Sequence, residues 1–114
     1  MQQIFLSSDA NQIFKVTLGG QSITILMRFQ TVSESWFISL YNTVDNTPYV
    51  INRRLTPNYL VFGNMFTDFV GDIIAGSVSE TFENIGRNDF NNVFGLYYLS
   101  SSEKEYYLGL QNGS

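Results

Sequence analysis

Apolar and polar side chains alternate along most of residues 11–30, on both sides of Gly19 and Gly20. A period of two is typical of β-strands that bury one face. Phe14 and Val16 would then lie on the buried face of the first strand. Two adjacent glycines readily adopt the positive φ angles that a tight hairpin turn requires. The pattern therefore predicts a β-hairpin whose register is set at its turn.

Two further stretches extend this pattern. Residues 36–42 (WFISLYN) carry apolar side chains on both faces, which indicates a strand that is covered on each side. Residues 43–48 (TVDNTP) indicate a turn, because Asp and Asn favour turn conformations and Pro cannot donate a hydrogen bond to a sheet. Residues 49–54 (YVINRR) read as a further short strand. We therefore expect strands two to four to form a meander.

The pattern is weaker in the second half of the chain. Residues 73–82 (IIAGSVSETF) read as a strand with Gly76 at a bulge or at a close approach of two backbones. Residues 93–99 (VFGLYYL) read as the last core strand. Residues 57–72 match neither a helical nor a strand period, and contain a proline and two glycines. This segment is either a loop with a short helical turn or a pair of bent strands.

Together these segments predict an all-β fold, a small antiparallel β-barrel or sandwich of about seven or eight short strands. The length of 114 residues corresponds to one domain. We expect a single β domain over residues 1–100. Residues 101–114 are expected to form a C-terminal extension, in which a flexible spacer precedes a short apolar arm.

Composition excludes several classes of function. The chain has no histidine and no cysteine, so it lacks the usual general base, thiolate nucleophiles and the commonest transition-metal ligands. Six basic and ten acidic residues give a net charge of −4, the wrong sign for binding nucleic acid. No segment has the length and apolarity of a signal peptide or a membrane span. We expect no cofactor, metal, nucleic acid or membrane partner, and synthesis or assembly in a cytoplasm.

Carboxylates are the main candidates for catalysis in such a chain. Asp68 and Asp72 would share a face if their segment were helical, and Glu80 lies close to Glu83 in the sequence. Paired carboxylates are what glycoside hydrolysis requires. Acidic residues near turns are commonly just solvated, and no pattern here sets the distance between them. We therefore predict that the protein is not an enzyme and has no catalytic residues.

Aromatic residues are in excess, at 16% of the chain. A core of this size would not hold all of them, so some are expected at the surface or against a partner. Adjacent strand residues face opposite sides, so one tyrosine of Tyr97-Tyr98 and one of Tyr106-Tyr107 should point away from the core. Trp36 lies in an apolar strand and is expected in the core. Two classes of function fit: a subunit of a large assembly, or a carbohydrate-binding module.

The order of several short motifs is informative. From residue 2 to residue 99 the chain contains, in order, QQIFL, NQIFKVTLGGQ, MRF, WFISLYN, NTPYV, GSV, NDF and LYYL. In order and spacing these segments resemble the plug protein family of the baseplates of contractile-tailed bacteriophages. Phe5 stands where that family usually has proline, and residues 100–114 extend past its usual end.

The resemblance implies a non-enzymatic structural virion protein, located in the tail baseplate and assembled in the host cytoplasm. It would plug or line the central channel at the hub and spike until the tail contracts. Its partners would be hub, spike or tail-tube subunits, with further copies of the chain as an additional option. A carbohydrate-binding β-sandwich module with exposed aromatics remains the alternative.

An interface hypothesis follows for the two ends of the chain. Either the arm from Tyr106 to Leu110 or the segment from Gln2 to Leu6 would add a strand to the exposed sheet edge of a neighbouring subunit. The residues assigned to this interface are Gln2, Gln3, Ile4, Phe5, Leu6, Tyr98, Tyr106, Tyr107, Leu108 and Leu110.

Overall fold

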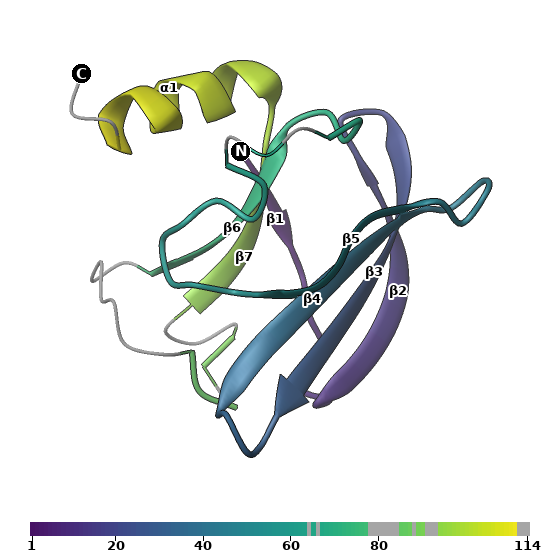
Figure 1. Cartoon of the computed structure of the whole chain (residues 1–114), viewed down its shortest axis with the longest axis vertical. Coiled ribbons are helices and arrows are strands. Elements are labelled where there is room, and N and C mark those ends of the chain that lie inside the picture. Colours follow the sequence, from purple (N-terminus) through teal and green to yellow (C-terminus); the bar gives the residue numbers. More distant parts are fainter. Residues whose placement is uncertain (64, 66, 78–84, 88, 91–93, 112–114) are drawn as a thin grey trace.

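The computed structural model of the protein describes residues 1–63, 65, 67–77, 85–87, 89, 90 and 94–111, with only the backbone for 109–111. Within these residues, seven strands form two antiparallel sheets, of order β1-β7-β6 and β2-β3-β4-β5, and one helix follows the last strand (Figure 1). The elements are β1 (Gln2–Ile4), β2 (Asn11–Leu18), β3 (Gln21–Gln30), β4 (Ser35–Asn42), β5 (Pro48–Arg54), β6 (Asp72–Ser77), β7 (Phe94–Leu99) and α1 (Ser101–Gln111). The predicted all-β class is confirmed. Over the described residues the sheets do not close into a barrel, so the architecture is a sandwich.

The predicted hairpin and meander are confirmed. Leu18 pairs with Gln21 across a two-residue turn in which Gly19 and Gly20 have φ angles of 57° and 80°. One face of the four-stranded sheet is buried, because alternate residues of β3 and β4 such as Ile25 are fully inaccessible to solvent. This face packs against the other sheet to form the core.

The β4–β5 pairing is irregular. Ile38 pairs with Arg53 and Leu40 with Val50, so residues 51–52 of β5 stand opposite the single residue Ser39. Asn52 has a φ angle of 51°, and its N–H donates a hydrogen bond of 2.9 Å to the Ser39 hydroxyl. This bulge satisfies the backbone group that the extra residue would otherwise leave unpaired.

The second sheet joins the two ends of the chain. β1 pairs with β7, so that Gln2 lies opposite Tyr98. On the other side of β7, β6 pairs in unbroken register, and Gly76 stands opposite Gly95. A Cβ at Gly76 would meet no atom closer than 3.8 Å, so the predicted bulge or close approach at this glycine is wrong. Residues 78–82 of that predicted strand lie outside the described residues.

The ambiguous segment before β6 is irregular backbone that covers the free edge of that strand. The N–H of Asn58 donates to the carbonyl of Ala75, and the N–H of Val61 donates to that of Ile73, both at 2.8 Å. These bonds satisfy part of the edge that β6 would otherwise expose. Of the two alternatives drawn from the sequence, the loop is the closer one, because the described part of the segment forms turns, with Tyr59 N–H donating to the Thr56 carbonyl and Met65 N–H to the Phe62 carbonyl.

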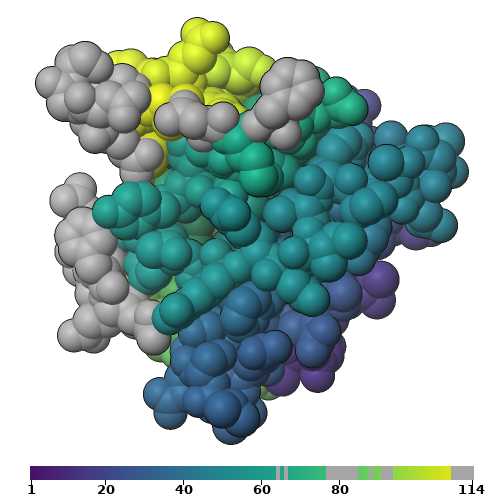
Figure 2. Space-filling model, viewed as in Figure 1, coloured from purple at the N-terminus to yellow at the C-terminus, as the bar shows by residue number. Residues whose placement is uncertain are grey.

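The predicted spacer and arm are wrong in structure, because residues 101–111 form α1. A capping box begins the helix: the Glu103 N–H donates to the Ser100 hydroxyl at 3.4 Å, and the Ser100 N–H donates to the Glu103 carboxylate at 2.9 Å. Tyr107 and Leu108 pack with Leu99 in a small apolar cluster outside the main core. Figure 2 shows α1 at one end of the molecule and the β4–β5 turn projecting from its side.

Candidate functional site

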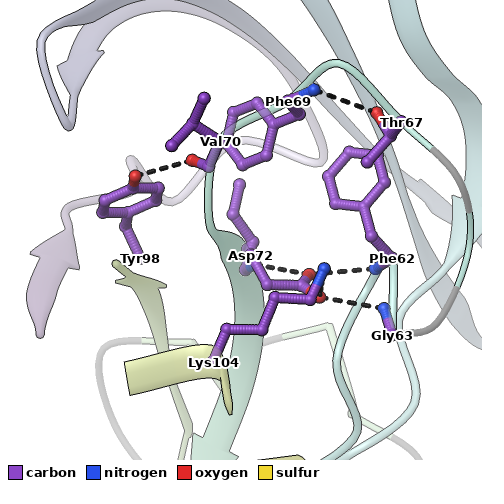
Figure 3. A network of polar contacts seen from close by, with 9 residues as sticks. Phe62, Gly63, Thr67, Phe69, Val70, Asp72, Tyr98 and Lys104 are labelled. Carbon is purple, nitrogen blue, oxygen red and sulfur yellow. Dashed lines mark hydrogen bonds and ion pairs between the residues drawn. The ribbon is translucent and has the colours of Figure 1, made fainter. Parts of the chain in front are cut away.

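Asp72 is the centre of a buried polar network (Figure 3). Its side chain is fully buried at the start of β6 and accepts hydrogen bonds from the N–H groups of Phe62, Gly63 and Ile73, at 2.9, 2.9 and 2.7 Å. The ammonium group of Lys104, on α1, lies 3.3 Å from the same carboxylate. A buried charge is tolerated only when it is paired and hydrogen-bonded in this way. Asp72 therefore ties the loop before β6 and the helix to one sheet.

This arrangement bears on Asp68 and Asp72, the carboxylate pair considered for catalysis. The segment that contains Asp68 and Asp72 is not helical, so the condition for the two residues to share a helix face is not met. Asp68 is exposed, whereas the oxygens of Asp72 are already occupied by backbone donors and by Lys104. Glu80 and Glu83 lie outside the described residues.

The same loop is also held at Val70. The Gln21 side chain accepts the Val70 N–H at 3.1 Å and donates to the Val70 carbonyl at 3.0 Å, and the Tyr98 hydroxyl donates to that carbonyl at 2.6 Å. Burial raises the pKa of Tyr98, and the negative charge of Glu103 adds to the effect. Gly71 has a φ angle of 96°, and a Cβ there would collide with the Leu99 carbonyl and the Tyr98 ring. Glycine is therefore required where the loop meets β7.

The structure brings the two chain ends together at one end of the molecule. β1 lies beside β7, α1 follows β7, and the N-terminal ammonium of Met1 forms an ion pair with Glu103 (Figure 1). Of the residues assigned to an interface, Gln2, Gln3, Phe5 and Tyr106 are exposed; Ile4, Leu6 and Tyr98 are buried; Tyr107 and Leu108 are half-buried; and the side chain of Leu110 lies outside the described residues. Residues 2–4 already form β1, and residues 106–110 already lie in α1.

The pKa of Glu103 provides a test of this junction. A hydrogen bond from the N-terminal ammonium, followed by one from the Ser100 N–H, lowers its pKa from 4.5 to about 2. Because the folded pKa is depressed, the stabilisation is present above the unfolded pKa and is lost as the pH falls through about 2. We expect the thermal midpoint of the native chain to exceed that of Glu103→Gln at about pH 6, and the difference to shrink towards about pH 2. An unchanged difference across this range, measured by circular dichroism, would contradict the assignment.

Trp36 is buried, as the sequence predicts, and is not a platform for sugar stacking. Its side chain is 2% exposed, and its Nε1–H donates to the Gly86 carbonyl at 2.9 Å. The rings of Phe29 and Phe90 contact it edge-on, at centroid distances of 5.3 and 5.4 Å. Tyr97 is half-buried and packs against the apolar cluster beneath α1. Trp36 and Tyr97 are therefore both used in packing.

The described residues hold neither a metal-ligand cluster nor a membrane-spanning helix. Within them, no three His, Cys, Asp or Glu side chains come together as metal ligands. No helix among them is long and apolar enough to span a membrane.

Comparison with known protein families shows which family the chain belongs to. A family model described as "Cyanophage baseplate Pam3 plug gp18" matches residues 1–102. The chain belongs to this family. The resemblance drawn from the motifs is confirmed, and this baseplate plug family member is a structural baseplate protein of a phage tail. The match ends in the first turn of α1, so most of the helix lies beyond it. Among curated proteins, none matches the chain.

Proposed function

We propose that the protein is a non-enzymatic plug that closes or lines the central channel of the baseplate at the hub and spike. The observation that carries the proposal is the family match over residues 1–102. Assembly would take place in the host cytoplasm, with hub, spike or tail-tube subunits, or further copies of the chain, as neighbours.

The internal hydrogen bonds support the proposal of a rigid protein with a structural role. The side chains of Asp72, Gln21 and Tyr98 form hydrogen bonds with the backbone of the loop before β6. Among the described residues, every buried side-chain nitrogen or oxygen has a hydrogen-bond partner. Polar groups that are satisfied internally stabilise one conformation and leave little unused chemistry for a substrate.

The contact with neighbours is proposed to run through the exposed side chains Gln2, Gln3, Phe5 and Tyr106, which we call the terminal face. Strand addition by residues 106–110 would first have to unfold α1, and a strand added at β1 could pair only with the edge of β1 that faces away from β7. Contact through side chains has no such requirement. Phe5 and Tyr106 are 76% and 73% exposed, and large exposed aromatics are typical anchors of protein interfaces.

The plug proposal is tested by cryo-electron microscopy of the chain purified with the hub and spike proteins encoded beside it. Density for the sandwich inside the axial channel would support the proposal. Density on the outside of the baseplate, or complexes that form without the chain bound at all, would overturn it.

The terminal face is tested in the same complex with the double variant Phe5→Ser, Tyr106→Ser. Loss of two anchors is expected to lower the amount of chain per complex about tenfold, measured by quantitative mass spectrometry. The matched control is Val44→Ser, at an 87% exposed position on the β4–β5 turn. Incorporation of the double variant at the level of the control would remove the terminal face from the interface.

A further inference from the structure

Charge is unevenly distributed over the fold. The four strands of the larger sheet contain Lys15, Arg28, Arg53 and Arg54, four of the six basic residues of the chain, and none of its ten acidic residues. The chain as a whole has a net charge of −4. A basic sheet in an acidic protein marks a local surface that repels cations and attracts acidic groups.

The strand register gathers part of this charge on the outer face of the sheet. On β2 and β3 the residues that alternate with the buried ones face outward, and Ile13 pairs with Leu26 while Lys15 lies two residues further along β2. Arg28 pairs with Phe37 of β4. We call these five residues the cationic face.

The cationic face combines apolar surface with uncompensated charge. Ile13 is 67% exposed, Leu26 and Phe37 are half-buried, and Lys15 and Arg28 are exposed. Within the described part of the chain, the side chains of Lys15 and Arg28 have no ion pair. Apolar residues at the centre with charged residues at the rim match the general anatomy of a protein interface, in which Arg is enriched.

We propose that the cationic face binds an acidic surface on another baseplate subunit. The inference rests on the proposed function and specifies one of its partners by charge. It also places a second contact on the sheet opposite the one that carries the terminal face.

Two other occupants fit the observations less well. A symmetric pair of copies would set Lys15 and Arg28 against the same residues of the second copy, because a two-fold interface brings the same patch together. Nucleic acid is disfavoured by the net charge of −4 and by the apolar residues at the centre of the face.

Zero-length cross-linking with a carbodiimide tests the partner directly, because the reagent joins a lysine amine to a carboxylate in contact with it. The chain has only two lysines. The N-terminal amine of Met1, which is paired with the accessible carboxylate of Glu103, is the internal reference. In the complex with hub and spike proteins, we expect Lys15 to be joined to Asp or Glu of a different subunit. A link to the acidic residues of another copy, or an unlinked Lys15 in complexes that contain the chain, would overturn the inference.

A charge reversal measures the contribution of the face. Arg28→Glu is expected to lower the amount of chain per complex about tenfold at physiological salt, since it places a like charge against the acidic partner. The control Arg53→Glu makes the same change on β5, at a position paired with core-facing Ile38, and should stay within about twofold of the native chain. Thermal unfolding of each variant checks that both still fold.

The outcomes separate the two proposals. If the native chain is bound in the channel and Arg28→Glu is incorporated as well as Arg53→Glu, the inference fails and the plug proposal stands. If the native chain does not enter the complex at all, both fail. Binding of a fluorescent DNA duplex that is lost in Arg28→Glu would assign the face to nucleic acid and overturn the inference.

Discussion

Replacing Asp72 by alanine is expected to lower the free energy of unfolding by about 3–5 kcal/mol. The substitution leaves the N–H groups of Phe62 and Gly63 without their acceptor and leaves Lys104, whose side chain is only 17% exposed, without its counter-charge. Uncompensated groups of this kind account for most of the cost of breaking a buried ion pair. Urea unfolding followed by tryptophan fluorescence measures the change, since the chain has a single tryptophan.

Asp68→Ala is the matched control for this prediction. It removes the other carboxylate of the same loop, which is exposed, and should change the free energy of unfolding by no more than about 0.5 kcal/mol. A loss below about 1 kcal/mol for Asp72→Ala would mean that the network does not hold the loop and helix in solution.

Replacing Trp36 by alanine is expected to cost a similar amount, about 3–5 kcal/mol. Its ring fills the space between Phe29 and Phe90, and its Nε1–H is the donor to the Gly86 carbonyl. The alanine variant would lose that burial, open a cavity and leave a carbonyl without its donor. The thermal midpoint, followed by far-ultraviolet circular dichroism, reports the loss.

Phe37→Ala, at the next residue of the same strand, controls for the loss of any aromatic ring. Phe37 is half-buried on the outer face, so its removal should cost about 1 kcal/mol. Equal decreases in the thermal midpoint for the two variants would show that Trp36 is not the better-packed residue in solution.

Most of the larger sheet could be predicted because its strands and turns are determined by residues that are close together in the sequence. The alternation over residues 11–30 and the glycines at its turn define the hairpin without reference to the rest of the chain. The burial of Trp36 follows from its apolar strand. A meander joins neighbours in sequence, so short connections determine its order.

The smaller sheet depends on contacts that no local pattern records. The pairing of Gln2 with Tyr98 joins residues at opposite ends of the chain, and residues 58–61 are ordered by the edge of β6 rather than by their own periodicity. The role of Asp72 is set by donors at residues 62–63. The helix is different, because Ser100 and Glu103 stand at capping-box spacing, a local signal from which the start of a helix can be predicted.

The pairing of the first strand with the last also sets an order of events during synthesis. A ribosome makes the chain from its N-terminus, and all four strands of the meander have been synthesised by residue 54. β1 must wait for residues 94–99, so Ile4 and Leu6 lack their final cover until almost the whole chain exists. The smaller sheet therefore cannot close until synthesis is almost complete, and its closure brings together the two ends that carry the terminal face.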